Sequence, residues 1–267
     1  NKSEAELKIE NQLITQLTSG ESQWEHHEEL RSESALWENF KRILEENNQA
    51  ALEGVPLTEK EFHQIQNQLN FSSYFEASKW LAGENGIAKV QVQREDAKYG
   101  KIRLSVFWRE EVAGGHSVYQ VVNQVERNRA NPEDQDRRLD VTLLINGLPL
   151  IHIELKNQSH PYMDAFRQIK KYLVEDKLTG IYSCLQMFVV TNNTDTRYIA
   201  SASAEKLNEQ FLATWVDKKN NPVNHLMEFA DCTLSIPAAH KMVSQYTVID
   251  TDKKALILLR PYQIHAI

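Results

Sequence analysis

The sequence predicts an α/β fold in which a mixed central β-sheet is flanked by helices. Three observations predict this fold class. Apolar residues recur at helical spacing through about residues 1–90, and after Gly100 they alternate with polar residues, as they do in strands. Between residues 139 and 191 the pattern runs strand, strand, helix, strand, and this order places helices on the faces of a mixed sheet.

The first part of the chain, about residues 1–90, is expected to be mainly helical. Two apolar stripes at helical spacing mark two helices; they consist of Leu7, Leu13, Ile14 and Leu17 and of Leu36, Trp37, Phe40, Ile43 and Leu44. Two shorter helices begin at capping boxes, one formed by Thr58 with Glu61 and the other by Ser73 with Glu76. We expect the apolar faces of these helices to serve packing.

The central part of the chain is expected to form the sheet. Residues 102–106 and 118–125 read as strands, and the clearest signal is the pair of apolar runs 139–145 and 148–156. Asn146-Gly147 joins them, and this dipeptide best supplies the two positive φ values of a type I′ turn, so we predict a β-hairpin. A helix over 162–173 and a buried strand over 185–191 follow. Beyond residue 208 we expect a loop, two short helices and the start of a last strand.

The composition is that of a folded soluble protein. The 267 residues are 41% hydrophobic and 25% charged, which suits one large domain or two modest ones. No apolar run approaches the ~20 residues that span a bilayer, and the first ten residues are too polar for a signal peptide. Cys184 and Cys232 form no CxxC pair, which argues against a disulfide framework and a zinc knuckle. We therefore expect a cytoplasmic protein with no membrane partner.

The charge distribution leaves a DNA partner open. The net charge of -7 does not favour nucleic acid, because phosphate binding needs clustered cations. The acidity is concentrated in residues 1–61, which carry 14 acidic and 6 basic side chains. From Val121 to Glu175 eight basic residues balance eight acidic ones. Charge alone therefore neither predicts nor excludes DNA binding.

Two acids and a lysine are candidates for chemistry at one end of the hairpin. Asp140 lies in its first strand, and Glu154 and Lys156 lie near the end of its second strand, where alternate residues share a face. Two carboxylates and a backbone carbonyl can hold a hard divalent cation such as Mg²⁺ while the lysine orients a water or stabilises charge on a phosphate. Phosphodiester hydrolysis needs this combination of groups.

The spacing of these three residues is by itself a weak signal, and a solvated hairpin end is its structural alternative. The strand is otherwise apolar, however, so an acid and a lysine near its end need a reason beyond solubility. Gln168 and Tyr172 then lie four residues apart on one face of the next helix. Their structural alternatives are an exposed polar residue and a core aromatic.

These residues carry a family resemblance. Asp140 in RRLDVTLLINGLPLIHIELK, the ELK that ends at Lys156, and the QxxxY of Gln168 and Tyr172 together resemble the PD-(D/E)xK nuclease superfamily. More narrowly, these runs and QMFVVTNNTDTRY resemble the N-terminal nuclease domain of the restriction (R, motor) subunit of type I restriction-modification enzymes. The likeness is strongest from Asn123 to Tyr198.

The resemblance implies a PD-(D/E)xK restriction-endonuclease-like fold and a role for each site residue. It implies that Asp140 and Glu154 bind Mg²⁺, that Lys156 acts in catalysis, and that Gln168 and Tyr172 assist. The family also has an acid in its first helix. Glu10 is the best match for that acid, and Glu6 is the alternative.

The end of the chain resembles a second domain. LRPYQIHAI is similar to the glutamine motif that opens a superfamily-two helicase motor, so Gln263 would bind the adenine of ATP. No GxxxxGK[ST] occurs in the sequence, so we expect ATP to serve only a longer, full-length subunit. We expect an endonuclease domain over 1–250, with a helical part (about 1–90), a nuclease core (about 91–200) and a helical connector (about 205–250), and the start of the helicase motor at 251–267.

Further candidates surround the nuclease core. Possible DNA contacts are Arg127, Arg129, Arg137, Arg138 and Lys170, although such arginines also pair with nearby acids. His152 alternates with Glu154 and is a possible neighbour of the site or a structural residue. The adjacent His26 and His27 are weak metal candidates, because neighbouring residues on a helix face different ways.

The function that the resemblance implies is Mg²⁺-dependent cleavage of double-stranded DNA, in defence against foreign unmodified DNA. Cleavage would follow ATP-driven translocation by the motor domains, and the methyltransferase (M) and specificity (S) subunits would be the partners. The alternative is a non-catalytic DNA-binding or coupling module that docks the motor to the methyltransferase. A separate repair or recombination nuclease is a third reading, which the motif at Gln263 disfavours.

Overall fold

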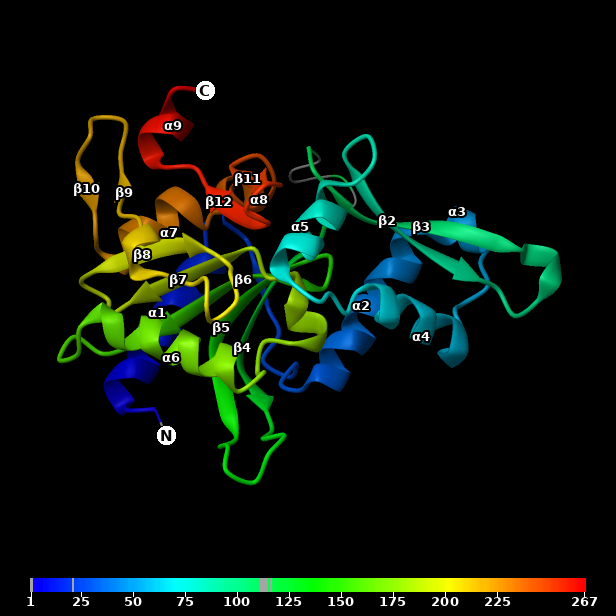
Figure 1. The fold of residues 1–267 in the computed structure, drawn as a ribbon, viewed down its shortest axis with the longest axis horizontal. Helices are drawn as coiled ribbons and strands as arrows, with labels where there is room; N and C mark the ends of the chain where they lie inside the picture. Colours follow the sequence, from blue (N-terminus) through cyan, green and yellow to red (C-terminus); the bar gives the residue numbers. More distant parts are fainter. Residues whose placement is uncertain (1, 21, 111–114, 116) are drawn as a thin grey trace.

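A six-stranded mixed sheet forms the centre of the molecule (Figure 1). The computed structural model describes residues 2–20, 22–110, 115 and 117–267. The strand order is β1-β4-β5-β6-β7-β8, with β1 parallel to β4, β6 parallel to β7, and the other pairs antiparallel. The strands are β1 (Glu25–His26), β4 (Tyr119–Arg127), β5 (Arg137–Ile145), β6 (Leu148–Leu155), β7 (Met187–Thr191) and β8 (Thr196–Ala200). The predicted mixed α/β fold is confirmed.

Helices cover both faces of this sheet. In Figure 1, α6 lies in front of the central strands and α1 behind them, and both helices contact β6. Every residue of β6 is buried, as expected for a strand covered on both faces. The helices are α1 (Glu4–Leu17), α2 (Glu33–Asn47), α3 (Gln49–Leu52), α4 (Glu59–Gln68), α5 (Tyr74–Ala82), α6 (Tyr162–Val174), α7 (Leu226–Thr233), α8 (Ile236–Ser244) and α9 (Pro261–His265). None of the described helices is both long and apolar enough to cross a membrane.

The predicted hairpin is confirmed as β5 and β6. Asn146 and Gly147 have φ values of 54° and 82°, as a type I′ turn requires. The Asn146 side chain accepts a hydrogen bond from the Val118 N–H and donates one to the Val106 carbonyl, which ties the turn to the preceding segments. A Cβ atom at Gly147 would lie 2.8 Å from the Cα of Phe40, so glycine is required here for space as well as for conformation.

A second sheet lies beside the helices. β2 (Ile87–Gln93) and β3 (Lys101–Trp108) form an antiparallel pair, and α4 and α5 pack on β2. The expectation of helices up to about residue 90 is therefore wrong at its end, because α5 stops at Ala82 and β2 begins at Ile87. Gln64 and Gln68 explain the position of β2, since their side-chain amides hydrogen-bond the backbone of Gln93 and Gln91.

Two helix starts, the two helices after residue 208 and the last strand match the expectations from the sequence, whereas the other short strands were not expected. Thr58 and Glu61 form the predicted capping box, and Ser73 accepts a hydrogen bond from the Glu76 N–H. The two expected helices after residue 208 are α7 and α8, and the expected last strand is β12. The small strands are β9 (Trp215–Val216), β10 (Pro222–Val223), β11 (Thr247–Asp250) and β12 (Ala255–Leu258), and short 3₁₀ turns occupy Ala97–Tyr99, Gly180–Cys184 and Glu209–Phe211.

Candidate active site

Two carboxylates face each other where the ladder between β5 and β6 ends. The last pair in the register is Val141 with Ile153, and one further step places Asp140 opposite Glu154. Both side chains are completely or almost completely buried. Asp140 Oδ2 accepts a hydrogen bond of 2.7 Å from the Leu155 N–H. The two acids that the sequence singled out therefore come together at one end of the hairpin.

Glu154 is held from two sides. Its Oε2 accepts a hydrogen bond of 2.9 Å from the Tyr172 hydroxyl on α6, and its Oε1 lies 2.9 Å from His152 Nε2. His152 Nδ1 in turn lies 3.1 Å from Thr142 Oγ1. A neutral ring that carries its hydrogen on Nε2 satisfies both contacts, because it donates to Glu154 and accepts from Thr142. His152 is thus the neighbour of the site that its alternation with Glu154 suggested.

Burial shifts the pKa values of Asp140, Glu154 and His152. Burial and the nearby Glu154 carboxylate raise the pKa of Asp140 to about 7, against the opposing charge of Lys2. Burial likewise raises the pKa of Glu154. Burial lowers the pKa of His152 to about 4, so the ring is neutral at neutral pH. Two buried carboxylates in contact need a cation beside them to remain charged together.

Lys2 supplies a cation that sequence reasoning missed. Its Nζ lies 2.6 Å from Asp140 Oδ1, 3.2 Å from the Leu155 carbonyl oxygen and 3.7 Å from Glu6 Oε2. Asp140 Oδ1 is buried and accepts no hydrogen bond from the described residues beyond this ion pair. Burial lowers the pKa of Lys2, but Asp140 and Glu154 outweigh this effect, and the pKa is raised. Nothing in the local pattern around Lys2 indicates this contact across the chain.

Glu10, the predicted acid of the first helix, lies beside this pair. It is buried, and its two oxygens accept hydrogen bonds from the side chains of Asn123 (3.1 Å) and Gln124 (2.7 Å) on β4. Burial raises the pKa of Glu10, and the charge of Asp140 adds to this. The alternative acid, Glu6, is also buried and approaches the site through Lys2.

Gln124 has an unusual backbone for a strand residue. Its φ is 55°, a conformation that a residue with a side chain adopts at a cost. The register skips it between Asn123–Val141 and Val125–Leu139, so it lies opposite Asp140. This local distortion directs its amide to Glu10, and it is not visible in the sequence pattern.

Lys156 and Gln168, the other two predicted site residues, have unengaged side chains among the described residues. Lys156 directly follows β6, is half-buried, and lies close enough for its charge to lower the pKa of Glu154. Gln168 is half-buried one turn before Tyr172 on α6. Within the described part of the chain, neither the Lys156 ammonium nor the Gln168 amide has a hydrogen-bond or ion-pair partner. Both groups are therefore free to contact a substrate.

The structure separates the candidate DNA contacts into buried and accessible ones. Arg127 is buried and donates to the carbonyls of Lys177 and Thr179 and to Glu33, which favours a structural role. The Arg137 guanidinium donates bidentate hydrogen bonds to the Glu175 carboxylate. The accessible cations are Arg129, Arg138, which is 3.3 Å from Glu126, and Lys170, which lies over the Phe166 ring. The buried position of Arg127 therefore does not support its predicted role as a DNA contact.

Among the described residues, the other candidates make no direct contact with Asp140 or Glu154. Gln263 is exposed on α9, where its Oε1 accepts a hydrogen bond from the Arg260 N–H. His26 lies 2.8 Å from the Asn123 side chain, whereas His27 contacts Glu25 and Glu29, so the two rings do not converge.

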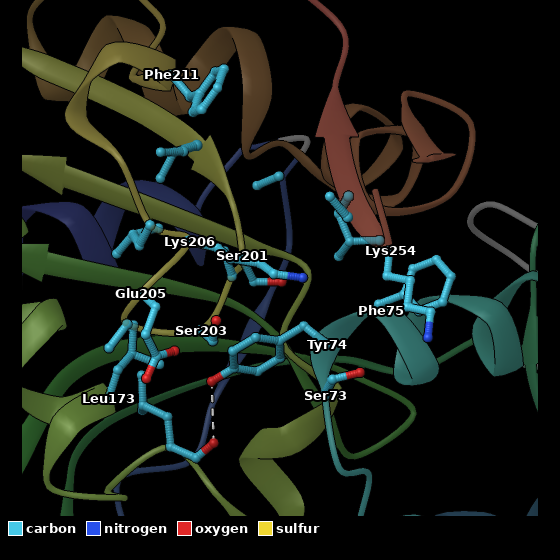
Figure 2. A pocket seen from close by; sticks show the side chains of 18 of the residues that line it. Ser73, Tyr74, Phe75, Leu173, Ser201, Ser203, Glu205, Lys206, Phe211 and Lys254 are labelled. Carbon is cyan, nitrogen blue, oxygen red and sulfur yellow. Dashed lines mark hydrogen bonds between the residues drawn. The ribbon is translucent and has the colours of Figure 1, made fainter. Parts of the chain in front are cut away.

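A cavity of about 640 Å³ lies elsewhere, between α5, the end of α6, and the segments around β8 and β12 (Figure 2). Figure 2 shows Tyr74 and Phe75 on one side of it and Ser201, Ser203 and Lys206 on another, and the Tyr74 hydroxyl donates to the Leu178 carbonyl. None of Asp140, Glu154 and Lys156 lines it. The cavity is therefore separate from the candidate active site.

Comparison with known proteins identifies the family. Residues 3–207 match the sequence model of the family described as type I restriction enzyme R protein N terminus. The chain is 34% identical over 265 residues to the type I restriction enzyme SauCOLORF180P endonuclease subunit of Staphylococcus aureus (strain COL), covering 99% of this chain and 26% of that protein. It is also 34% identical over 150 residues to the type I restriction enzyme EcoprrI endonuclease subunit of Escherichia coli, covering 55% of this chain and 46% of that protein.

The match to the S. aureus subunit extends along nearly the whole chain, which spans about a quarter of that relative's length. The matched family region includes Glu10, Asp140, Glu154, Lys156 and Tyr172. The chain therefore belongs to the family of N-terminal regions of type I restriction enzyme R proteins.

Proposed function

We propose that this chain is the Mg²⁺-dependent endonuclease domain of a type I restriction R subunit and that it hydrolyses phosphodiester bonds of double-stranded DNA. The observation that carries the proposal is the buried pair of Asp140 and Glu154 at the end of the hairpin, with the free ammonium of Lys156 beside it. In the complete enzyme, cleavage would follow ATP-driven translocation by the motor domains. The methyltransferase and specificity subunits would select the DNA, and the biological role would be defence against unmodified DNA.

The residues present fit a magnesium site. Asp140 Oδ1, a carboxylate oxygen of Glu154 and the carbonyl oxygen of Leu155 are hard oxygen ligands, and a cation already lies against two of them in the form of the Lys2 ammonium. Within the described ranges, no group of three His, Cys, Asp or Glu side chains is arranged to hold a metal, so the carbonyl oxygen is needed. Mg²⁺ suits such a site, because it commonly keeps several waters and takes only one or two carboxylates.

The protein groups divide the remaining work. A bound Mg²⁺ would polarise the phosphate and lower the pKa of a water. Tyr172 and His152 hold Glu154 in one orientation, so its lone pairs are directed before substrate arrives. Lys156 can orient the attacking water or stabilise the negative charge that builds on the phosphate. The Gln168 amide, one turn before Tyr172, can donate a hydrogen bond to the DNA backbone.

The DNA would approach from the side where Arg138 lies. The Tyr172 hydroxyl is 3.4 Å from the Arg138 carbonyl oxygen, so this arginine is a neighbour of the carboxylate pair along the chain and in space. Its guanidinium is largely exposed, which leaves it able to contact a phosphate.

The proposal is tested by changing each carboxylate to the isosteric amide in the complete enzyme. Asp140→Asn and Glu154→Gln should each reduce plasmid cleavage by at least 100-fold, because each removes a charged ligand. Asp164→Asn on α6, a half-exposed acid paired with Arg167, is the matched control and should cleave normally. Normal cleavage by both site variants would reject the proposal.

A further inference from the structure

We propose that Lys2 competes with the divalent metal for the same oxygen ligands. The Lys2 ammonium occupies the oxygens that the metal needs and leaves when the metal binds. This inference rests on the proposed function, since it assumes the metal site at Asp140 and Glu154. Lys2 would then set the metal concentration at which the site is loaded.

The distances make the two cations mutually exclusive. Lys2 Nζ lies 2.6 Å from Asp140 Oδ1 and 3.2 Å from the Leu155 carbonyl oxygen. Mg²⁺ bonds oxygen at about 2.0–2.1 Å and would need the same two atoms. Two cations on one pair of oxygens would repel strongly in a site where Asp140 is fully buried. Metal binding therefore requires Lys2 to withdraw.

The burial pattern gives Lys2 a route out. The Asp140 side chain is 0% exposed, whereas that of Lys2 is 16% exposed, so the lysine lies between the acids and solvent. Lys2 precedes Ser3, the N-cap of α1, and thus lies outside the helix. Glu6, whose Oε2 is 3.7 Å from Nζ, gives the displaced ammonium a second carboxylate to pair with.

The same contact explains how two buried carboxylates persist together. A buried acid without a counter-charge is costly, and Lys2 supplies that charge at Asp140 Oδ1, which accepts no hydrogen bond from the described residues. Exchange of the ammonium for Mg²⁺ keeps a cation in place throughout. Lys2 should therefore stabilise the protein in chelator and weaken metal binding. Replacing Lys2 should accordingly lower the stability in chelator and raise the metal affinity.

The first experiment measures Mn²⁺ binding by calorimetry to the complete, nucleotide-free subunit. Lys2→Met keeps most of the side-chain length and removes the charge, so we expect its Mn²⁺ affinity at this site to rise at least tenfold. In chelator the same variant should melt at a lower temperature than wild type, and saturating Mn²⁺ should raise its melting temperature by more. Lys8→Met, which removes an exposed lysine of the neighbouring helix α1, should leave both quantities unchanged.

The second experiment needs no variant. Amine-reactive labelling of the wild-type subunit, read by mass spectrometry, should modify Lys2 slowly in chelator and at least threefold faster with Mn²⁺, whereas Lys8 should react equally in both. Labelling of Lys2 that is unchanged or slower with Mn²⁺ would overturn the inference even if Lys2→Met failed to fold.

The outcomes separate this inference from the proposed function. If Asp140→Asn leaves Mn²⁺ binding unchanged, the metal site itself is wrong and both proposals fail. If Asp140→Asn removes Mn²⁺ binding while Lys2→Met binds Mn²⁺ as wild type does, or more weakly, the metal site stands and the competition is rejected.

Discussion

The Tyr172 hydroxyl donates a hydrogen bond of 2.9 Å to Glu154 Oε2, while His152 Nε2 lies 2.9 Å from the other oxygen of the same carboxylate. A residue of helix α6 and a residue of strand β6 thus orient the Glu154 carboxylate from two sides. The QxxxY pattern therefore has a structural meaning in this chain, because its tyrosine orients the acid of the ELK motif. Orientation of Glu154 is expected to matter both for stability and for cleavage.

Tyr172→Phe tests the contribution of this hydrogen bond. Removing the hydroxyl leaves a buried carboxylate oxygen without its donor, which should lower the free energy of unfolding by about 1–3 kcal/mol in chelator. Cleavage should slow at least tenfold, equivalent to about 1.4 kcal/mol of barrier. Melting curves and plasmid-cleavage rates measure the two effects. Tyr162→Phe in the first turn of α6 is the control, and an equal change in both variants would show that the contact with Glu154 is unimportant.

Glu10→Gln tests the acid of the first helix. Glu10 lies between the amides of Asn123 and Gln124 and is electrostatically coupled to Asp140. Loss of its charge should slow cleavage at least tenfold, whereas the exposed Glu4→Gln on the same helix should cleave as wild type does. Glu6→Gln should have the smaller effect of the two buried acids, because Glu6 approaches Asp140 only through Lys2. The reverse order in a cleavage assay would make Glu6 the functional acid.

The pH dependence of stability should reveal two opposing groups. His152 has a folded pKa of about 4 against 6.5 ordinarily, so its contribution is present above pH 6.5 and is lost as the pH falls toward 4. Asp140 has a folded pKa of about 7 against 3.8, so its contribution is present at low pH and is lost as the pH rises toward 7. These two contributions change in opposite directions with pH, so the wild-type curve isolates neither of them.

Asp140→Asn removes one of these groups and should expose the other. In chelator, its free energy of unfolding should fall by up to about 3 kcal/mol between pH 6.5 and pH 4, relative to a double variant that also carries His152→Gln. Denaturant titrations at a series of pH values measure this difference. Parallel curves for the single and double variants would show that the buried ring does not resist protonation.

Arg138 and Arg127 should respond differently to removal. Arg138→Ala should weaken DNA binding and lower the slope of log affinity against log salt by about 1, with little change in stability, because its pair with Glu126 is exposed. Arg127→Ala should lower the free energy of unfolding by about 2 kcal/mol or more, since its guanidinium joins two carbonyls and Glu33. DNA affinity measured at several salt concentrations and melting curves test this difference. Weakened DNA binding with normal stability in Arg127→Ala, together with lowered stability in Arg138→Ala, would contradict it.

The parts of the fold that sequence predicts well are those determined by local pattern. Asn146-Gly147 requires two positive φ values that few other dipeptides accept, so the hairpin follows directly. The turn alone would pair Asp140 with Ile153, and a register shift between Leu143 and Leu144, which the turn does not predict, brings Asp140 opposite Glu154. Strand β2 also alternates, with Ala88, Val90 and Val92 buried, and this signal could have corrected the expected helical boundary.

The parts that sequence does not predict depend on contacts between distant segments. Lys2 reaches the carbonyl of Leu155 across 153 positions, and Gln124 reaches Glu10 across 114. Arg127 belongs to a basic stretch that reads as a DNA contact, yet Glu33 and two carbonyls bury it. No periodicity or motif encodes such pairings, because they arise only when α1 and α2 pack against the sheet that contains β4 and β6.

The most direct test of the nuclease assignment is Lys156→Ala in the complete enzyme, with translocation and DNA cleavage followed in one reaction. The Lys156 ammonium has no partner in the described part of the chain, so its loss should not disturb folding. We expect cleavage to fall at least 100-fold while ATP hydrolysis and translocation remain at wild-type rates, and Lys171→Ala, an exposed lysine of α6, to leave all three unchanged. Undiminished cleavage by Lys156→Ala would contradict the account, and joint loss of cleavage and translocation would indicate a coupling module instead.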